Sequence, residues 1–256
     1  MKRFTRIMLL LSAVFIASGC LFCFIGTALG GQVSDVFDNV YLDTGKGRLV
    51  VSGQGISQTD FTRRCAGVKS LEIDVGLADC TVIRSAVSEV RITGNSSGNG
   101  PEMFQEDGTL YITQESGMSI PLFGDGTNAE NIRIEIPEDL VLEKLWIHNG
   151  LGNTVVQEIS CESLVLENGL GNITFTGSVE KEGRISNGMG QTALTLTGER
   201  DDYNYELSCG FGSLSVDGSK YSGIDLKENI HNGSNRILQA DCSFGNISIR
   251  FREEIL

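Results

Sequence analysis

Apolar and polar residues alternate with a period of two over most of the second half of the chain. Leu164 and Leu166 precede one glycine-rich turn, Ile173 and Phe175 follow it, and the interleaved residues are mainly polar or small. This alternation is typical of strands that bury one face. Frequent β-branched residues and glycines disfavour helices in these segments. The pattern therefore predicts an all-β domain.

A five-residue turn of the form Asn-Gly-Leu-Gly-Asn recurs between the alternating segments. Its copies begin at Asn149, Asn168, Asn187, Cys209 and Cys242, and a degenerate copy begins at Val75. The intervals between the five are 19, 19, 22 and 33 residues, and we interpret the longer ones as insertions between successive coils. A regular repeat in which each coil bonds to its neighbours is typical of a solenoid. The sequence predicts a β-solenoid of coils of about 19 residues over residues 67–256, with an N-terminal transmembrane helix before it.

The turn residues suggest how the coils stack. Asn149, Asn168 and Asn187 continue the inward alternation and are expected to form a buried ladder of amides. Glycines at positions two and four are expected to allow positive φ and close stacking of backbones; they are Gly150, Gly152, Gly169, Gly171, Gly188, Gly190, Gly210, Gly212 and Gly245. The apolar residue between them is expected to fill the turn from inside, at Leu151, Leu170, Met189, Phe211 and Phe244.

Cys209 and Cys242 occupy the ladder position in the last two copies. Stacked coils lie about 4.8 Å apart, within the Cα separation that a disulfide spans. The pair is therefore either a candidate disulfide or two small apolar ladder residues, and the sequence leaves both open.

The N-terminal segment predicts a membrane anchor. The stretch from Ile7 to Leu29 is apolar or small, long enough to span a bilayer, and follows basic residues. Residues 1–6 would be a cytoplasmic tail, 7–30 the single-pass anchor, and 31–66 a tether with a capping strand outside the cytoplasm. Two alternatives are a lipoprotein signal acylated at Cys20 and a cleaved signal peptide.

Two strand motifs upstream of the coils add to the pattern of the turns. The strand Asn131–Pro137 ends in Ile-Pro, and a Leu-x-x-Leu-x-Ile strand from Leu142 leads into the first full turn. Together with the serial turns over residues 68–250, they resemble the putative-adhesin β-solenoid family of bacterial cell-surface proteins, a domain of unknown function. The resemblance implies a right-handed β-helix-like fold, a surface location, a role in adhesion or envelope stress, and no catalytic residues.

Charge and residue chemistry restrict the function. A net charge of −13 disfavours nucleic-acid binding. His148 and His231 are far apart and unsuited to a zinc site, and we expect no cofactor or metal. Carboxylates that an enzyme could use lie at scattered registers: Asp74, Glu143, Glu162, Glu167 and Glu206.

The sequence thus favours a non-catalytic binding or scaffolding module on the cell surface, of adhesin or envelope-stress-sensing type. Its partners would be the membrane, through the anchor, and an unknown surface protein or glycan. The alternative is a polysaccharide-active β-helix enzyme, and a third hypothesis is a spacer that regulates a membrane partner. Residues 96–100 and 118–128, rich in Gly, Ser and Asn, are predicted to be loops.

Overall fold

The structure is a computed structural model that describes residues 40–43, 48–51, 58–97, 100–114, 118–121, 130–222 and 225–253. The chain divides into two compact units. The larger comprises residues 55–116 and 127–256, and the smaller residues 1–54 and 117–126. In the smaller unit β2 (Arg48–Val51) pairs antiparallel with β1 (Val40–Asp43) and with β9 (Met118–Pro121).

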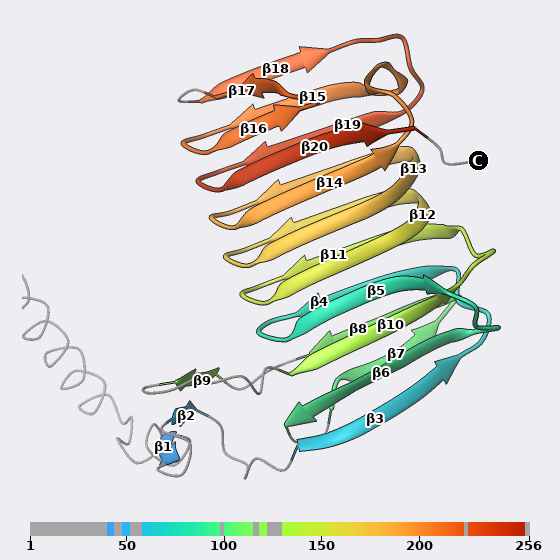
Figure 1. Cartoon of the computed structure of the whole chain (residues 1–256), viewed down its shortest axis with the longest axis vertical. Helices are drawn as coiled ribbons and strands as arrows, with labels where there is room; N and C mark the ends of the chain where they lie inside the picture. Colours follow the sequence, from blue (N-terminus) through green and yellow to red (C-terminus); the bar gives the residue numbers. More distant parts are fainter. Residues whose placement is uncertain are drawn as a thin grey trace, which may run out of the picture. The chain divides into compact units, whose positions relative to one another are not determined.

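The larger unit belongs to the all-β class. Its strands are stacked in two faces, in a β-solenoid-like arrangement (Figure 1). One face contains, in spatial order, β7 (Glu102–Glu106), β8 (Thr109–Gln114), β4 (Ser70–Val75), β11 (Leu142–Asn149), the second halves of β12 (Asn153–Asn168) and β13 (Asn172–Asn187), β19 (Ile237–Cys242), β15 (Asn204–Cys209) and β18 (Leu226–Ile230).

The other face is built in the same way. It contains β3 (Gln58–Cys65), β6 (Val90–Ser97), β10 (Asn131–Pro137), β5 (Asp79–Ser85), the first halves of β12 and β13, β14 (Gln191–Thr197), β20 (Asn246–Arg252), β16 (Ser213–Val216) and β17 (Ser219–Tyr221). Most neighbouring strands are parallel. On each face the antiparallel pairs lie toward the two ends: β7 with β8 and β15 with β18 on the first face, and β3 with β6, β6 with β10 and β16 with β17 on the second.

The two faces are joined at two edges. At the turn edge, the five-residue glycine turns connect a strand of one face to a strand of the other. At the return edge, β12 and β13 bend continuously from one face to the other, with register shifts at Val156/Ile159 and Cys161/Ser163. These shifts are β-bulges, which bend the strand that carries the extra residue.

The order of the coils differs from the order of the repeats in the sequence. We expected successive copies to stack in sequence order, with insertions between them. This expectation is wrong for the last two copies, because β19 pairs with both β13 and β15, and β20 pairs with both β14 and β16. The Cys242 turn therefore lies between those of Asn187 and Cys209, and Figure 1 shows β19 and β20 between β14 and β16. The 33-residue interval holds β17 and β18, which cover the end of the stack.

A single apolar core fills the space between the two faces. It extends as one cluster from Val68 to Ile249, and its side chains are the inward members of the alternation. Two tyrosines and Phe175 are the largest side chains that are wholly buried. Because this core lies within the larger unit, a piece spanning residues 55–256 keeps the whole core that the unit needs to fold. The piece also carries β9, without its partner β2.

Several sequence-based predictions concern the N-terminal region. Residues 1–39, with the predicted anchor and Cys20, lie outside the described residues. Within the described residues, no helix is long and apolar enough to span a membrane. The segment 31–66 contains β1, β2 and β3, of which β3 pairs with β6 at the end of the stack, the position of a cap. Strand β6 reaches Ser97 and β9 covers Met118–Pro121, so the predicted loops are in part strands.

Candidate functional site

The turn edge is organised by the buried asparagines. Asn149, Asn168 and Asn187 are at most 5% exposed. Each donates through Nδ2 to a backbone carbonyl of its own turn, at 2.9–3.0 Å. Asn149 also donates to Oδ1 of Asn168 at 2.9 Å, and Asn168 to that of Asn187 at 2.8 Å. The amides thus form a continuous ladder in which buried polar atoms bond along the stack.

Close stacking makes glycine necessary at the turns. A Cβ on Gly171 would lie 2.0 Å from the carbonyl oxygen of Gly152 and 2.5 Å from Nδ2 of Asn149. Positive φ was also expected at these positions, and this prediction is wrong, because the glycines with positive φ lie elsewhere. Contact with the backbone of the next coil, rather than backbone conformation, therefore excludes a side chain there.

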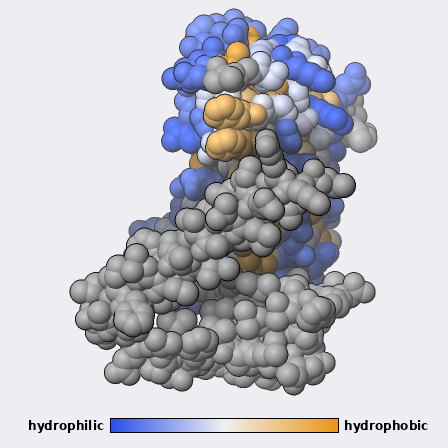
Figure 2. Space-filling model, turned by 90° about the vertical axis from the view of Figure 1, so that its left-hand side faces the viewer, coloured by the Kyte–Doolittle hydropathy of each residue, from blue (hydrophilic) through white to orange (hydrophobic). Residues whose placement is uncertain are grey.

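The apolar residues at the turn tips point outward. We expected them to fill the turns from inside, and the structure contradicts this. They are 48–67% exposed: Leu151, Leu170, Met189, Phe244 and Phe211. The physical reason is that the asparagine amide and the adjacent backbone already occupy the interior of the turn. Figure 2 faces this edge, and hydrophobic (orange) atoms gather there among hydrophilic ones. We call these five side chains the apolar ridge.

The ladder continues into the two cysteines as free thiols. Cys242 pairs in register with both Asn187 and Cys209. Its Sγ lies 3.0 Å from the carbonyl oxygen of Gly245, the contact that each asparagine amide makes in its own turn. Burial raises the pKa of the Cys242 thiol. Both cysteines are unbridged in the structure, and their pairing under oxidising conditions stays a prediction.

The return edge carries a strained residue. Glu158 has φ of 57° inside strand β12, a conformation that non-glycine residues rarely adopt. It lies in the bulge between Val156 and Ile159. Gly177 of β13 is in register with Ile159, and a Cβ added to Gly177 would lie 1.8 Å from the carbonyl oxygen of Ile159. Such strain is found at binding sites more often than elsewhere, because it aims a side chain that regular geometry would place differently.

A polar cleft opens beside this bulge, with a cavity volume of about 440 Å³. Segments far apart in sequence contribute its charged side chains: Arg84, Glu158, Glu180, Asp202, Arg236, Arg252 and Glu253. Arg252 pairs with Glu158, and Nη2 of Arg236 lies 2.9 Å from Oε2 of Glu180. Three arginines and four carboxylates give the cleft a nearly balanced charge on a strongly acidic protein.

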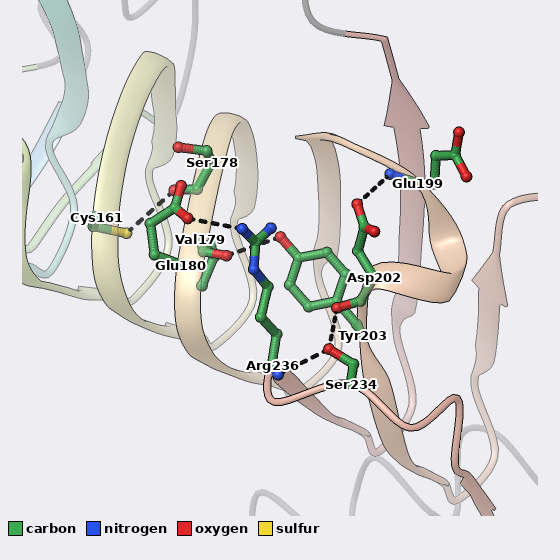
Figure 3. A network of polar contacts seen from close by, with 9 residues as sticks. All are labelled: Cys161, Ser178, Val179, Glu180, Glu199, Asp202, Tyr203, Ser234 and Arg236. Carbon is green, nitrogen blue, oxygen red and sulfur yellow. Dashed lines mark hydrogen bonds and ion pairs between the residues drawn. The ribbon is translucent and has the colours of Figure 1, made fainter.

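One wall of the cleft is held by a network of polar contacts (Figure 3). The Tyr203 hydroxyl donates to the Val179 carbonyl at 2.9 Å, and the Arg236 guanidinium lies over the Tyr203 ring, 5.7 Å from its centroid. The backbone N–H of Arg236 donates to the Ser234 hydroxyl, which donates to the carbonyl of Asp202. Arg236 and Glu180 are therefore fixed before any ligand binds.

Arg84 is the least satisfied charged group of the cleft. Its Nη2 donates to the Ser160 hydroxyl at 3.1 Å. Its Nε is buried and has no hydrogen-bond partner among the described residues. Buried donors in folded proteins are almost always bonded. The Arg84 Nε is therefore a polar atom of the cleft wall that lies beneath the accessible surface and is left unsatisfied by the described residues.

The electrostatics of the cleft do not suit general acid catalysis. A hydrogen bond from Arg252 is the main cause that lowers the pKa of Glu158. A glycosidase acid needs the opposite, a carboxyl whose pKa is raised so that it stays protonated. Glu180 lies in an ion pair with Arg236. The arrangement can bind hydroxyl and carboxylate groups, and Glu158 is not poised to donate a proton.

The residues named from sequence as candidate catalysts have ordinary surface partners, but their registers are not all scattered, as was expected. Asp74, His148 and Glu167 form one row across β4, β11 and β12. Glu143 and Glu162 lie side by side on β11 and β12. Oδ1 of Asp74 lies 2.8 Å from Nδ1 of His148. The other carboxylates contact neighbours on their own face: Glu143 with Lys69, Glu162 with Lys181, Glu167 with Trp146 and Glu206 with Gln239. Over the described part of the chain, no group of three or more His, Cys, Asp or Glu is placed to hold a metal ion.

Sequence reasoning missed the cleft because its residues share no motif. Arg84, Glu158 and Arg252 belong to three strands that meet only after the C-terminal strand inserts into the stack. The one local signal was Gly177 at a strand centre, since an isolated glycine in a strand often marks a bulge.

The fold defines the chain as a β-solenoid-like rack of stacked two-stranded coils. A model of the Toastrack DUF4097 family matches residues 68–254. The chain therefore belongs to the Toastrack DUF4097 family, as the resemblance predicted. No curated protein matches the chain.

The chain is also similar to solved structures of bacterial proteins. A structure described as a putative cell adhesion protein from Clostridium sporogenes is 13% identical, with a TM-score of 0.51, and the match covers 77% of this chain and all of that one. A putative adhesin from Bacteroides fragilis is 11% identical, with a TM-score of 0.40 and coverage of 75% and 97%. A putative lipid binding protein from Parabacteroides distasonis is 12% identical, with a TM-score of 0.26 and coverage of 75% and 96%. At these identities the first similarity shows the fold alone, and the other two carry no argument.

Proposed function

We propose that this chain is a non-catalytic binding module, anchored in the membrane by residues 7–30 and displayed outside the cytoplasm, and that the polar cleft recognises a surface glycan. The anchor is a prediction from the sequence, and the right-handed sense of the coil is what the family resemblance implies. The observation that carries the proposal is the cleft itself, a polar cavity of about 440 Å³ beside a strained bulge, in which two ion pairs present guanidinium and carboxylate groups.

The chemistry of the cleft favours a hydroxyl-rich ligand. Guanidinium and carboxylate groups in one cleft offer both donors and acceptors, which suits the hydroxyl groups of a sugar. A strongly anionic ligand would meet four carboxylates, and a cation would meet three arginines. The description of the Clostridium sporogenes structure as a putative cell adhesion protein is compatible with a surface binding role. The lowered pKa of Glu158 argues against that residue as the acid of the polysaccharide-cleaving alternative.

A glycan array tests the proposal. The piece 55–256 should bind at least one class of glycan, and Arg84→Gln should weaken that binding about tenfold, because a charge-assisted hydrogen bond is lost. Lys144→Gln is the control, since Lys144 pairs with Glu72 on one face of the stack. Failure to bind any glycan, or equal binding by Arg84→Gln, would overturn the proposal. Release of shortened sugars would instead support the enzyme.

A further inference from the structure

The apolar ridge is a surface that the proposed glycan cleft does not use. Its five side chains occupy consecutive turns, because each turn donates a backbone hydrogen bond to the next. At one end the rings of Phe211 and Phe244 stack with centroids 5.3 Å apart. Contiguous exposed apolar surface in a soluble domain usually marks an interaction site.

The ridge projects from the domain instead of enclosing a ligand. Its members are the tips of tight turns, and neither the polar cleft nor the groove beside β15 and β19 is lined by them. Small-molecule sites are concave and cover most of their ligand. A projecting row of apolar tips suits insertion into a soft medium.

The amide N–H groups of the ridge are bonded to the adjacent coil. The N–H of Leu170 donates to Gly150 O at 2.8 Å, that of Met189 to Gly169 O at 2.9 Å, and that of Phe244 to Gly188 O at 2.8 Å. Polar backbone groups that enter the apolar part of a bilayer must be bonded internally. The N–H groups of the tips meet this requirement, which suits shallow insertion of the side chains at the headgroup level.

Charge is absent from the turns that carry the ridge. The five turn sequences, from residue 149 to 153 and at the corresponding later positions, contain only Asn, Gln, Cys, Ser, Gly and the apolar tips. On a chain of net charge −13, the five ridge turns themselves therefore contribute no carboxylate to the edge. One carboxylate lies beside the first of them, where Oδ1 of Asp79 accepts from the backbone N–H of Asn153 at 2.9 Å.

A second copy of the chain is the competing occupant. The half-exposed ridge side chains together offer roughly 500–600 Å², on the basis of about 150–250 Å² for a fully exposed aromatic side chain. A stable interface buries about 800 Å² from each partner. A bilayer has no such threshold, since binding grows with each inserted side chain. The predicted anchor ends near residue 30 and the larger unit begins at Gly55, so the bilayer lies within reach of the tether.

We infer that the apolar ridge docks the solenoid edgewise on the surface of a lipid bilayer, with Leu, Met and Phe tips inserted between zwitterionic headgroups. The cleft at the return edge then faces away from the membrane, because the two edges lie on opposite sides of the stack (Figure 1). The strong negative charge of the chain makes zwitterionic lipid the preferred surface and anionic lipid a weaker one.

Flotation of the piece 55–256 with phosphatidylcholine vesicles tests the inference. The wild-type piece should float with the vesicles, and at low salt replacing part of the lipid with phosphatidylglycerol should weaken binding. The variant Leu170→Ser, Met189→Ser, Phe244→Ser should lose at least about tenfold in partition. The matched control, Phe104→Ser with Val141→Ser, removes side chains that are 56% and 51% exposed outside the ridge and should bind like the wild type.

Two further arms keep the outcome decisive. Met189→Trp should strengthen partition several-fold, because tryptophan favours the membrane interface, and it does not depend on the triple variant folding. Arg84→Gln should leave flotation unchanged, so that failure of the glycan proposal is distinguishable from failure of this one. Absence of vesicle binding, or binding that the triple variant retains, overturns the inference. A ridge-dependent dimer in sedimentation without vesicle binding would assign the ridge to a second copy instead.

Discussion

The turn edge and the return edge join the same two faces, but adjacent coils meet at them in different ways. At the turn edge, backbone lies against backbone, and a buried amide ladder repeats the same bonds at each level. At the return edge, a bulge places Glu158 at positive φ, and side chains from distant segments form a cleft. The comparison indicates that regular stacking at one edge leaves the other free to vary.

The largest effect is expected from a side chain added between the stacked turns. Gly171→Ala should lower the free energy of unfolding by about 3 kcal/mol, because its Cβ would overlap the Gly152 carbonyl and force the coils apart. Gly76→Ala is the control, since its Cβ would be 3.6 Å from the nearest atom, an ordinary contact. Urea denaturation measures both. Equal stability of the two variants would show that the turn edge is not close-packed.

The amide ladder should be next in importance. Asn168→Ala removes the amide that donates to Gly171 O and to Asn187, and it takes away the Oδ1 to which Nδ2 of Asn149 donates. We therefore expect the free energy of unfolding to fall by about 2 kcal/mol. Asn168→Cys should lose less, because Cys242 makes the equivalent turn contact through its thiol. Thermal denaturation distinguishes them.

The matched control for the ladder lies on the surface of the same turn. Asn172→Ala removes an exposed hydrogen bond to Asn153 and should change stability by less than about 0.5 kcal/mol. If Asn172→Ala proved as costly as Asn168→Ala, burial of the ladder would not be the source of its contribution.

At the return edge, relief of strain should stabilise the fold. Glu158→Gly and Glu158→Ala both lose the pair with Arg252, but only glycine adopts positive φ without cost. We expect Glu158→Gly to exceed Glu158→Ala by about 1 kcal/mol in free energy of unfolding. Equal values in chemical denaturation would mean that the bulge is unstrained.

The smallest effect concerns pH. A hydrogen bond from Arg91 is the main cause that lowers the pKa of Glu135, as Arg252 does for Glu158. A lowered folded-state pKa contributes stability that is present above the unfolded value of about 4.3 and is lost as the pH falls toward the folded value. Glu135→Gln should therefore flatten the decline in stability below that pH. An unchanged decline in acid denaturation would contradict the assignment.

Sequence reasoning recovered what depends on period and composition. The alternation identified the strands, and the 19-residue interval placed Asn149, Asn168 and Asn187 in register because equal coil lengths align equal positions. It did not give the outward direction of Leu151 and its counterparts, since that depends on how the amide fills the turn. The insertion of β19 and β20 and the cleft between distant strands are tertiary features with no local pattern.

Hydrogen exchange of the native solenoid tests the contrast between the edges most directly. Amides of the turn edge, such as Leu170 and Met189, bond to the adjacent coil, so they should exchange only by global unfolding. Amides at the bulge around Glu158 and Gly177 should exchange faster, through local opening. Equal protection at both edges, or faster exchange at the turns, would contradict the account of a locked turn edge and a variable return edge.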